Sequence, residues 1–355
     1  MSSVKQVKVG SILIGGGAPI TVQTMWDRPI REVDDSLIKT MESYHKKGCD
    51  LVRFALPSLN DVDIISQLIP KVSMPLVGDI HFDYKIALKA IEAGFHKIRI
   101  NPGNIGEEWK IREVIKAASD HGTAIRIGAN EGSLSAEQKQ RARDGSVEER
   151  SRVLVEAAEA NLEVFEQSGF SNIVISLKSS DIHVTYHSNK LFRERHDYPL
   201  HLGITEAGPL IPAIVKSTLG LADLLKEGIG ETVRISISDN PEYEILAANE
   251  LLGNLELRKG RIKIISCPKC GRSSFDTHAF LDSVKEELYT LPVDVTVAIM
   301  GCTVNGPGEA SHADLGITGY GKQIQIFRHG KVIRREDPCT AKEAFLEELV
   351  RLQQG

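Results

Sequence analysis

The sequence predicts an α/β protein in which a (β/α)8 barrel, or TIM barrel, is followed by a smaller α+β domain. Eight short runs rich in β-branched residues recur within roughly the first 240 of the 355 residues, with helical patterns between them. Several helical patterns stop at a glycine, as at Gly48, Gly94 and Gly122, which is a common way for a helix to end. After Ser238 the alternation stops, and a second set of elements begins near Arg261.

The eight predicted strands are nearly continuous in apolar residues, which is typical of a parallel sheet covered by helices. They are PITVQTM from Pro19, LVRFAL from Leu51, PLVGDI from Pro75, KIRINPG from Lys97, AIRIGAN from Ala124, NIVISLK from Asn172, PLHLGIT from Pro199 and TVRISIS from Thr232. Helical segments such as DDSLIKTMESYHKKG and EEWKIREVIKAASDHG lie between them. A doubly wound open sheet is the alternative, because a strand count made from pattern alone can be wrong by about one or two.

The segment from Glu131 to Glu149 is long, polar and charged, and it follows the fifth predicted strand. Active sites form on that face of a barrel, so the segment is interpreted either as a lid or rim or as a solvated surface excursion.

The remaining elements define the domain division. A helix over Tyr243–Leu252 is expected to close the barrel. It is followed by a strand in RIKIISC, a helix over Asp276–Thr290, a strand in VDVTVAIMGC, strands in ADLGITG and KQIQIFRHGKVI, and a final helix over residues 341–353. We therefore expect a substrate-binding barrel over residues 1–258 and a second domain over residues 259–355.

Composition excludes several classes of protein. The 43 Lys and Arg residues are outnumbered by 48 Asp and Glu residues, whereas a general nucleic-acid binder usually carries a basic surplus. No apolar run approaches the roughly 18 residues of a membrane span, and the N-terminal segment lacks the pattern of a secretory signal. We therefore expect a cytoplasmic enzyme that binds neither nucleic acid nor membrane.

Four predicted strands carry an arginine in the same local pattern. Side chains alternate between the two faces of a strand, so each arginine and its apolar neighbours point in opposite directions. If the neighbours pack against the helices, all four guanidinium groups point into the barrel, where burial is costly unless anions compensate. These residues are Arg53, Arg99, Arg126 and Arg234. They are explained either by ion pairs within the barrel core or, as we prefer, by a site for a multiply charged anion.

Other polar residues at the predicted strand ends favour the anion site. Lys178 ends the sixth strand and adds a cation, while Asp79, Glu206 and Asp239 are candidate partners for some of the arginines. His81 also follows a strand, in GDIHFD. The further polar strand ends are Asn101, Asn130, Thr205, Ser236 and Ser238. In a TIM barrel these ends build the active site.

Cysteines in the second domain indicate a metal site. The chain has five cysteines, an odd number that disfavours a disulfide framework. Cys267 and Cys270 have the CxxC spacing that lets two thiolates bind one metal centre, Cys302 ends a later strand, and Glu309 follows on a Gly/Pro-rich turn. The CPxCG pattern is common in zinc ribbons, which normally need a second ligand pair. Three thiolates with one oxygen ligand suit a cubane iron–sulfur cluster better, although zinc remains open.

A combination of nine segments, in order from about Pro19 to Gly319, is highly specific: PITVQTM, LVRF, GDIHFDYKIAL, RINPGNIG, IRIGANEGSL, HLGITEAG, EGIGETVRIS, CPKCGR and GCTVNGPGEA. This combination resembles the 4-hydroxy-3-methylbut-2-enyl diphosphate synthase family of the non-mevalonate isoprenoid pathway, in its bacterial two-domain form. The resemblance implies reductive ring opening and dehydroxylation of 2-C-methyl-D-erythritol 2,4-cyclodiphosphate to 4-hydroxy-3-methylbut-2-enyl diphosphate. It also implies a 4Fe-4S cluster, flavodoxin or ferredoxin as electron donor, a head-to-tail homodimer, and a C-terminal domain similar to sulfite-reductase modules.

The resemblance also implies residue roles. The cluster ligands fall on Cys267, Cys270, Cys302 and Glu309, and the proton-delivering glutamate falls on Glu206. Glu309 is counted as catalytic as well, because it is an exchangeable ligand. The substrate-binding residues fall on Arg53, His81, Arg99, Arg126, Asn130, Lys178, Thr205, Arg234, Ser236 and, on the cluster side, Asn305.

Two segments depart from the family pattern. Trp26-Asp27-Arg28-Pro29 replaces a Thr/Asn-rich stretch after the first strand, which leaves the contacts of that loop unassigned. Pro209-Leu210-Ile211-Pro212 replaces small residues and is expected to stiffen its loop.

The alternative function is a TIM-barrel phosphosugar lyase or aldolase in which Lys178 forms a Schiff base and a zinc ribbon is purely structural. A nicotinamide site is not expected, because the chain lacks a GxGxxG strand–turn–helix unit.

Overall fold

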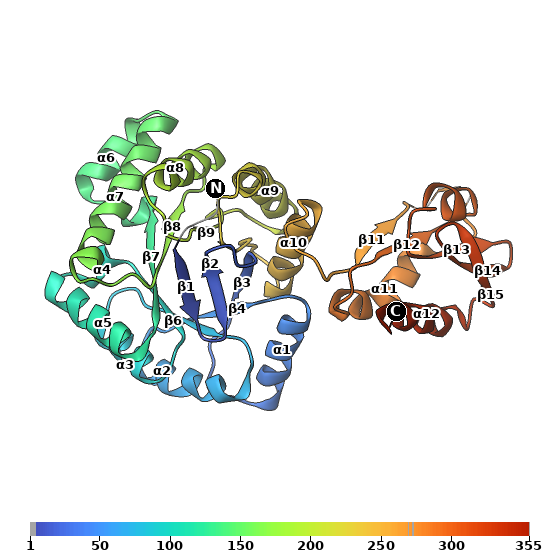
Figure 1. Cartoon of the computed structure of the whole chain (residues 1–355), viewed down its shortest axis with the longest axis horizontal. Helices are drawn as coiled ribbons and strands as arrows, with labels where there is room; N and C mark the ends of the chain where they lie inside the picture. Colours follow the sequence, from blue (N-terminus) through green and yellow to red (C-terminus); the bar gives the residue numbers. More distant parts are fainter. Residues whose placement is uncertain (1–4, 269, 272, 355) are drawn as a thin grey trace. The chain divides into compact units, whose positions relative to one another are not determined.

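The computed structural model describes residues 5–268, 270–271 and 273–354, and the chain divides into two compact units, Met1–Leu257 and Arg258–Gly355. The first unit is a barrel surrounded by helices, and the second is a five-stranded sheet with helices packed on it (Figure 1). Within the described part of the chain, no helix is both long enough and apolar enough to cross a membrane.

Eight parallel strands form the barrel in the spatial order β8-β7-β6-β5-β4-β3-β10-β9. They are β3 (Thr21–Met25), β4 (Leu51–Ala55), β5 (Leu76–Asp79), β6 (Lys97–Ile100), β7 (Ala124–Asn130), β8 (Ile173–Lys178), β9 (His201–Leu202) and β10 (Thr232–Val233). The parallel bridge between Ile175 and Leu200 joins β8 to the start of β9 and closes the ring. The predicted TIM barrel is therefore confirmed, and the open-sheet alternative is wrong.

Helices surround the barrel because each presents apolar residues to the strands, and most of them begin at a side-chain cap. In α1, for example, Asp34 Oδ1 accepts a hydrogen bond from the Leu37 N–H at 2.8 Å, while Leu37 and Met41 are buried against the strands. Gly122 ends α5 in the left-handed conformation with φ 68°, as the glycine pattern predicts. The helices are α1 (Asp35–Lys46), α2 (Leu59–Ile65), α3 (Tyr84–Glu92), α4 (Pro102–Ile105), α5 (Glu108–His121), α6 (Ala136–Asp144), α7 (Val147–Gln167), α8 (Ile182–Arg195), α9 (Leu210–Lys226) and α10 (Pro241–Asn254), with short 3-10 turns η1 (Ser66–Lys71) and η2 (Glu131–Ser133).

A hairpin that the sequence analysis did not predict covers the amino-terminal end of the barrel. It consists of β1 (Gln6–Val9) and β2 (Ile12–Gly15), paired antiparallel. Its buried residues Val7, Val9 and Ile14 pack against apolar side chains at the beginnings of the barrel strands, among them Leu51 and Val77. With this end closed, the carboxyl ends of the strands are the end at which a ligand can enter.

Two segments that the sequence analysis singled out, Glu131–Glu149 and Pro209–Pro212, are helical in part. After η2, the polar stretch after the fifth strand forms α6 and the start of α7, and Arg141 of α6 binds Glu149 and Glu156 of α7 at 2.7 Å each. It is thus an extra surface helix bound to α7. The proline-containing segment Pro209–Pro212 begins α9, with Pro209 at the cap.

The second unit is a mixed sheet with strand order β11-β12-β13-β14-β15. Its elements are β11 (Lys263–Ser266), α11 (Thr277–Thr290), β12 (Thr296–Met300), the π-helical turn η3 (Val304–Glu309), β13 (Leu315–Tyr320), β14 (Gln323–Arg328), β15 (Lys331–Glu336) and α12 (Ala341–Gln354). Phe280 and Val284 of α11 and Phe345 of α12 form one core with Val297 and Ile317 of the sheet. The first three strands are parallel, so β11 and β12 end at the same edge.

Candidate active site

Strand alternation places the four arginines inside the barrel, as predicted. The residues on either side of each arginine, such as Val52 and Phe54 beside Arg53, belong to the core between strands and helices. The arginines therefore project to the opposite side of their strands.

The arginines meet other predicted residues in one cavity of about 220 Å³. Asp79, Gly128, Ala129 and Ser176 line part of it. All the predicted substrate-binding residues of the barrel line it as well, namely Arg53, His81, Arg99, Arg126, Asn130, Lys178, Thr205, Arg234 and Ser236. We call this space the anion cavity. The residue not placed is Asn305, whose side chain lies outside the described part of the structure.

Asp79, at the end of β5, binds two of the arginines. Its Oδ1 lies 3.3 Å from Arg99 Nη1, and its Oδ2 lies 3.7 Å from Arg53 Nε. Burial alone would raise the pKa of Asp79, but the guanidinium groups of Arg53, Arg99 and Arg126 lower it below its ordinary value. Burial also lowers the pKa of Arg53 to about 10, despite the attraction of Asp79. One carboxylate shared by several cations leaves the cavity with surplus positive charge.

Arg126 is the least compensated cation of the cavity. Its residue is 2% exposed, and its Nε and Nη1 have no hydrogen-bond partner among the described residues. Burial, and then repulsion by Arg53 and Arg99, lower the pKa of Arg126 well below its ordinary value. A buried donor without an acceptor destabilises the free protein. Ion pairs within the core therefore do not account for Arg126, and the geometry favours an anion that supplies the acceptors.

Lys178 is in a similar position at the end of β8. Burial, and then repulsion by Arg126 and Arg234, lower the pKa of Lys178 well below its ordinary value. A bound anion would reverse this effect by favouring the charged ammonium.

Two glycines make room for these cations. A Cβ at Gly128 would lie 3.1 Å from Arg99 Nε, and a Cβ at Gly203 would lie 2.5 Å from Lys178 Nζ. Gly128 lies on β7 and Gly203 directly follows β9, and at either position a larger residue would push a cation out of place. The sequence analysis did not single them out, although each lies within a motif, IRIGAN or HLGIT.

A further layer of buried polar side chains lies inside the barrel. It is one inward-facing position closer to the amino-terminal ends of the strands than the arginines are. Gln23, Lys97 and His201 are each fully buried, and Gln23 Nε2 and Oε1, Lys97 Nζ and His201 Nε2 have no hydrogen-bond partner in the described part of the chain. Burial, followed by repulsion from Arg126 and Arg53, lowers the pKa of Lys97 well below its ordinary value. The sequence analysis named none of these residues.

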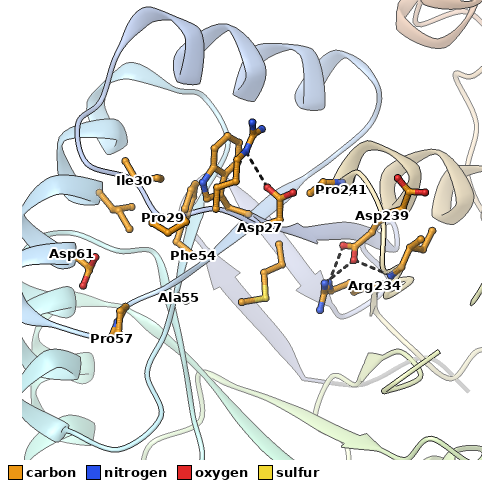
Figure 2. Close-up of a pocket in the computed structure, with 16 residues that line it drawn as sticks. Asp27, Pro29, Ile30, Phe54, Ala55, Pro57, Asp61, Arg234, Asp239 and Pro241 are labelled. Carbon is orange, nitrogen blue, oxygen red and sulfur yellow. Dashed lines mark hydrogen bonds and ion pairs between the residues drawn. The ribbon is translucent and has the colours of Figure 1, made fainter. Parts of the chain in front are cut away.

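The partner of Arg234 was also missed. Arg234 binds Glu244 of α10 through two hydrogen bonds, Nε to Oε2 at 2.9 Å and Nη2 to Oε1 at 2.6 Å (Figure 2). The predicted partners Glu206 and Asp239 form no ion pair with these arginines among the described residues, so those two pairings are wrong. Glu244 lies in the first turn of a helix, where an acidic residue is expected for other reasons.

Glu206 itself is exposed and does not line the anion cavity. Its backbone has φ 53°, in the left-handed region that residues other than glycine rarely adopt. It directly follows Thr205, which does line the cavity.

In the second unit, two of the predicted cluster ligands follow neighbouring parallel strands. Cys267 directly follows β11, its N–H bonds to Ile299 of β12, and its Sγ accepts a hydrogen bond from the Gly301 N–H at 3.1 Å. Cys302 directly follows Gly301 and is buried, whereas Cys270 is exposed. Glu309 is the last residue of η3. Within the described residues, no three His, Cys, Asp or Glu side chains lie close enough together to hold a single metal ion.

Comparison with known proteins identifies the family. A family model described as the GcpE TIM-barrel domain matches residues 4–249, and one described as the GcpE protein C-terminal domain matches residues 263–351. The chain belongs to the GcpE family. The resemblance stated from the sequence is thereby confirmed, and the lyase or aldolase alternative is set aside.

Similar proteins extend over nearly the whole chain. A GcpE relative from Treponema pallidum (strain Nichols), named 4-hydroxy-3-methylbut-2-en-1-yl diphosphate synthase (flavodoxin), is 45% identical over 97% of this chain and 89% of its own length. A relative of the same name from Thermodesulfovibrio yellowstonii is 41% identical over 97% of each chain. Dihydropteroate synthase from Thermus thermophilus shares the barrel fold, with a TM-score of 0.51 and 14% identity over 71% of this chain and 98% of that one.

Proposed function

We propose that this GcpE protein is a 4-hydroxy-3-methylbut-2-enyl diphosphate synthase. It opens the ring of 2-C-methyl-D-erythritol 2,4-cyclodiphosphate, takes up two electrons and releases one hydroxyl group as water. The observation that carries the proposal is the anion cavity, in which five cations surround one shared carboxylate among the described lining residues. The names of the GcpE relatives support the same reaction.

The residues of the barrel bind and orient the substrate. Arg53, Arg99, Arg126 and Lys178 bind the diphosphate, with Arg126 supplying the donors that lack acceptors in the free protein. Arg234 is oriented by Glu244. The uncharged polar residues and His81 are proposed to bind the remaining oxygens of the substrate. Because the positive charge is already in place, it stabilises charge that develops on the diphosphate as the ring opens.

Glu206 is proposed to hold the proton that the departing hydroxyl group receives. Its position beside Thr205, at the carboxyl end of β9, supports this role.

Cys267, Cys270, Cys302 and Glu309 are proposed to hold a 4Fe-4S cluster. The donor set fits, because two of the sulfur atoms follow adjacent parallel strands and a backbone N–H donates to the Cys267 sulfur, a contact that tunes a bound thiolate. When bound, the cluster supplies the electron transfer that amino-acid side chains cannot perform. Flavodoxin or ferredoxin is proposed as the electron donor, and a head-to-tail homodimer as the assembly. The cytoplasmic location expected from the sequence stays a prediction.

An anaerobic assay tests the reaction directly. The purified protein is incubated with the cyclic diphosphate and either a chemical reductant or reduced flavodoxin, and the linear allylic diphosphate is measured. Turnover by the wild type, and its loss in Arg126→Leu with the cluster intact, are expected. A fully iron-loaded protein without turnover would contradict the proposal.

The cluster assignment predicts the effect of single substitutions. Cys267→Ser, Cys270→Ser and Cys302→Ser are each expected to lose most of their iron, because an oxygen ligand replaces a thiolate poorly. Cys49→Ser and Cys339→Ser are the matched controls and should keep wild-type iron content. Iron and sulfide analysis after anaerobic purification measures the difference. Iron loss in Cys339→Ser equal to that in Cys302→Ser would show that the ligand set is wrong.

Glu309 separates the iron–sulfur cluster from a zinc site. Glu309→Cys should still bind a cluster but lose most turnover, because a thiolate exchanges less readily than a carboxylate. A structural zinc site predicts zinc instead of iron, with the activity of Glu309→Cys unchanged.

A further inference from the structure

Figure 2 shows a second cavity, of about 450 Å³. Apolar side chains make up most of its wall, including Trp26, Ile30, Phe54, Ala55 and Pro57. We call it the apolar cavity. Part of the wall comes from the Trp26–Pro29 segment, where the sequence departs from the family pattern.

The two cavities share a boundary. Arg234 lines both of them. Met25 lines the apolar cavity, and its Sδ lies 2.7 Å from Nη2 of Arg53, which lines the anion cavity. The thioether of methionine is unbranched and adapts its conformation readily. Met25 is therefore a flexible side chain at the boundary between the two cavities.

The charges determine which end of such a ligand enters which cavity. In the wall of the apolar cavity, Asp27 pairs with Arg28 at 3.3 Å and Glu244 with Arg234 at 2.6 Å. The other charged residues among its described lining, Asp61 and Asp239, are both acidic and would repel a phosphate. The surplus of cations lies in the anion cavity. An anionic head group belongs there, and an uncharged hydrocarbon belongs in the apolar cavity.

We propose that the apolar cavity binds the hydrocarbon chain of a prenyl diphosphate longer than the enzyme's own product, with its diphosphate in the anion cavity. The inference rests on the proposed function, since it takes the anion cavity to be a diphosphate site. Such a ligand occupies the place of the cyclic substrate, so elongated allylic diphosphates inhibit the enzyme competitively. The apolar cavity is larger than the anion cavity and lies in the range typical of ligand pockets.

The expected affinity follows from apolar burial. Each methylene group removed from water lowers the dissociation constant by roughly fourfold. Inorganic pyrophosphate, dimethylallyl diphosphate and geranyl diphosphate form a series with the same head group and increasing hydrocarbon. Ordering the hydrocarbon chain in the cavity costs conformational entropy, which offsets part of this gain. We therefore expect geranyl diphosphate to bind the wild-type holoenzyme at least about tenfold more tightly than pyrophosphate does.

Two variants that fill the apolar cavity test the location. Ala55 and Pro57 are exposed residues of the wall, on the opposite side from Arg234 and Asp239 in Figure 2. Ala55→Trp and Pro57→Phe should reduce the affinity for geranyl diphosphate to that for pyrophosphate, while the affinity for pyrophosphate stays within about twofold of wild type. Ala136→Trp, on the exposed first turn of α6, is the matched control and should keep the wild-type preference.

Calorimetric titration of the holoenzyme with the three ligands, supported by inhibition of turnover, distinguishes the outcomes. If pyrophosphate does not bind the wild type, the diphosphate site itself is wrong. If pyrophosphate binds and geranyl diphosphate binds no more tightly, only the apolar-cavity proposal is overturned. The proposal is also overturned if both cavity-filling variants fold and still bind geranyl diphosphate more tightly than pyrophosphate by the wild-type factor.

Discussion

At the scale of single residues, this chain buries cations that its own carboxylates do not neutralise. Asp79 is shared between Arg53 and Arg99, and Glu244 is committed to Arg234, so Arg126 keeps two nitrogens without an acceptor among the described residues. Folding the free protein around such groups costs free energy. We expect the proposed diphosphate to supply the missing acceptors and so to offset this cost.

The first prediction separates binding from stability at Arg126. Arg126→Leu should weaken pyrophosphate binding by roughly 10- to 100-fold, because it removes charge-assisted hydrogen bonds. Its midpoint of urea unfolding should stay at or above the wild-type value, because an uncompensated buried charge is removed. Arg141→Leu, a surface residue of α6, is the control for binding. A large loss of stability in Arg126→Leu would show that the guanidinium group is structural.

The second prediction concerns the pH dependence that Lys97 contributes. Burial lowers the pKa of Lys97 in the folded protein, so between that value and the ordinary lysine value of about 10.4 the unfolded chain binds more protons. Stability contributed by this group therefore rises with pH across that window and is lost as the pH falls.

Lys97→Met removes this contribution and replaces an unpartnered ammonium or amine with an apolar chain of similar length. We expect the variant to be more stable than wild type by about 1–3 kcal/mol near neutral pH and the advantage to shrink as the pH rises. Urea unfolding at about pH 7 and about pH 9 measures it. Parallel stability–pH curves for the two proteins would contradict the prediction.

At the scale of elements, the alternation of strand side chains builds the site. Inward positions of β4, β6 and β7 carry three of the arginines, and Arg234 directly follows β10. Gly128 and Gly203 leave the space that the neighbouring cationic side chains need. A strand in this barrel is therefore constrained at its small inward positions as much as at its charged ones.

The third prediction tests Gly203. A Cβ there would lie 2.5 Å from Lys178 Nζ and 2.6 Å from the Arg234 carbonyl oxygen, so Gly203→Ala should displace the lysine and the neighbouring strand. We expect pyrophosphate affinity to fall by about tenfold or more, with a stability loss of about 1–3 kcal/mol from overpacking. Gly253→Ala in α10 meets nothing within 4 Å and should be neutral or stabilising. Wild-type affinity in Gly203→Ala would show that Lys178 does not need this space.

At the scale of the whole molecule, each of the two compact units has a large apolar core of its own. One core joins the barrel strands to their helices, and the other joins the five-stranded sheet to α11 and α12. Each unit can therefore bury apolar surface without the other.

The fourth prediction follows from those separate cores. A chain ending at Leu257 should unfold cooperatively and bind pyrophosphate with an affinity within a few-fold of wild type, because the anion cavity draws its described lining from the first unit alone. It should have no reductive turnover. Circular dichroism during thermal unfolding and calorimetric titration make the measurement. A truncated chain that remains unfolded would show that the second unit is needed for the barrel to fold.

The sequence was sufficient for features that depend on local pattern. Runs of β-branched residues identified all eight barrel strands, and alternation oriented the arginines, because both properties are set by residues a few positions apart. The short β1–β2 hairpin was missed, since two strands of four residues leave a weak pattern.

Only the tertiary structure decided which charges meet. Asp79 faces two arginines because β4, β5 and β6 lie side by side, whereas Glu206 and Asp239 pair with none of the four and Glu244 reaches Arg234 from a helix. The glycines beside Arg99 and Lys178, and the apolar cavity beside the anion cavity, likewise depend on strand register and helix docking. These contacts join residues far apart in the chain, and their free energies are set by burial and distance, which local sequence pattern does not contain.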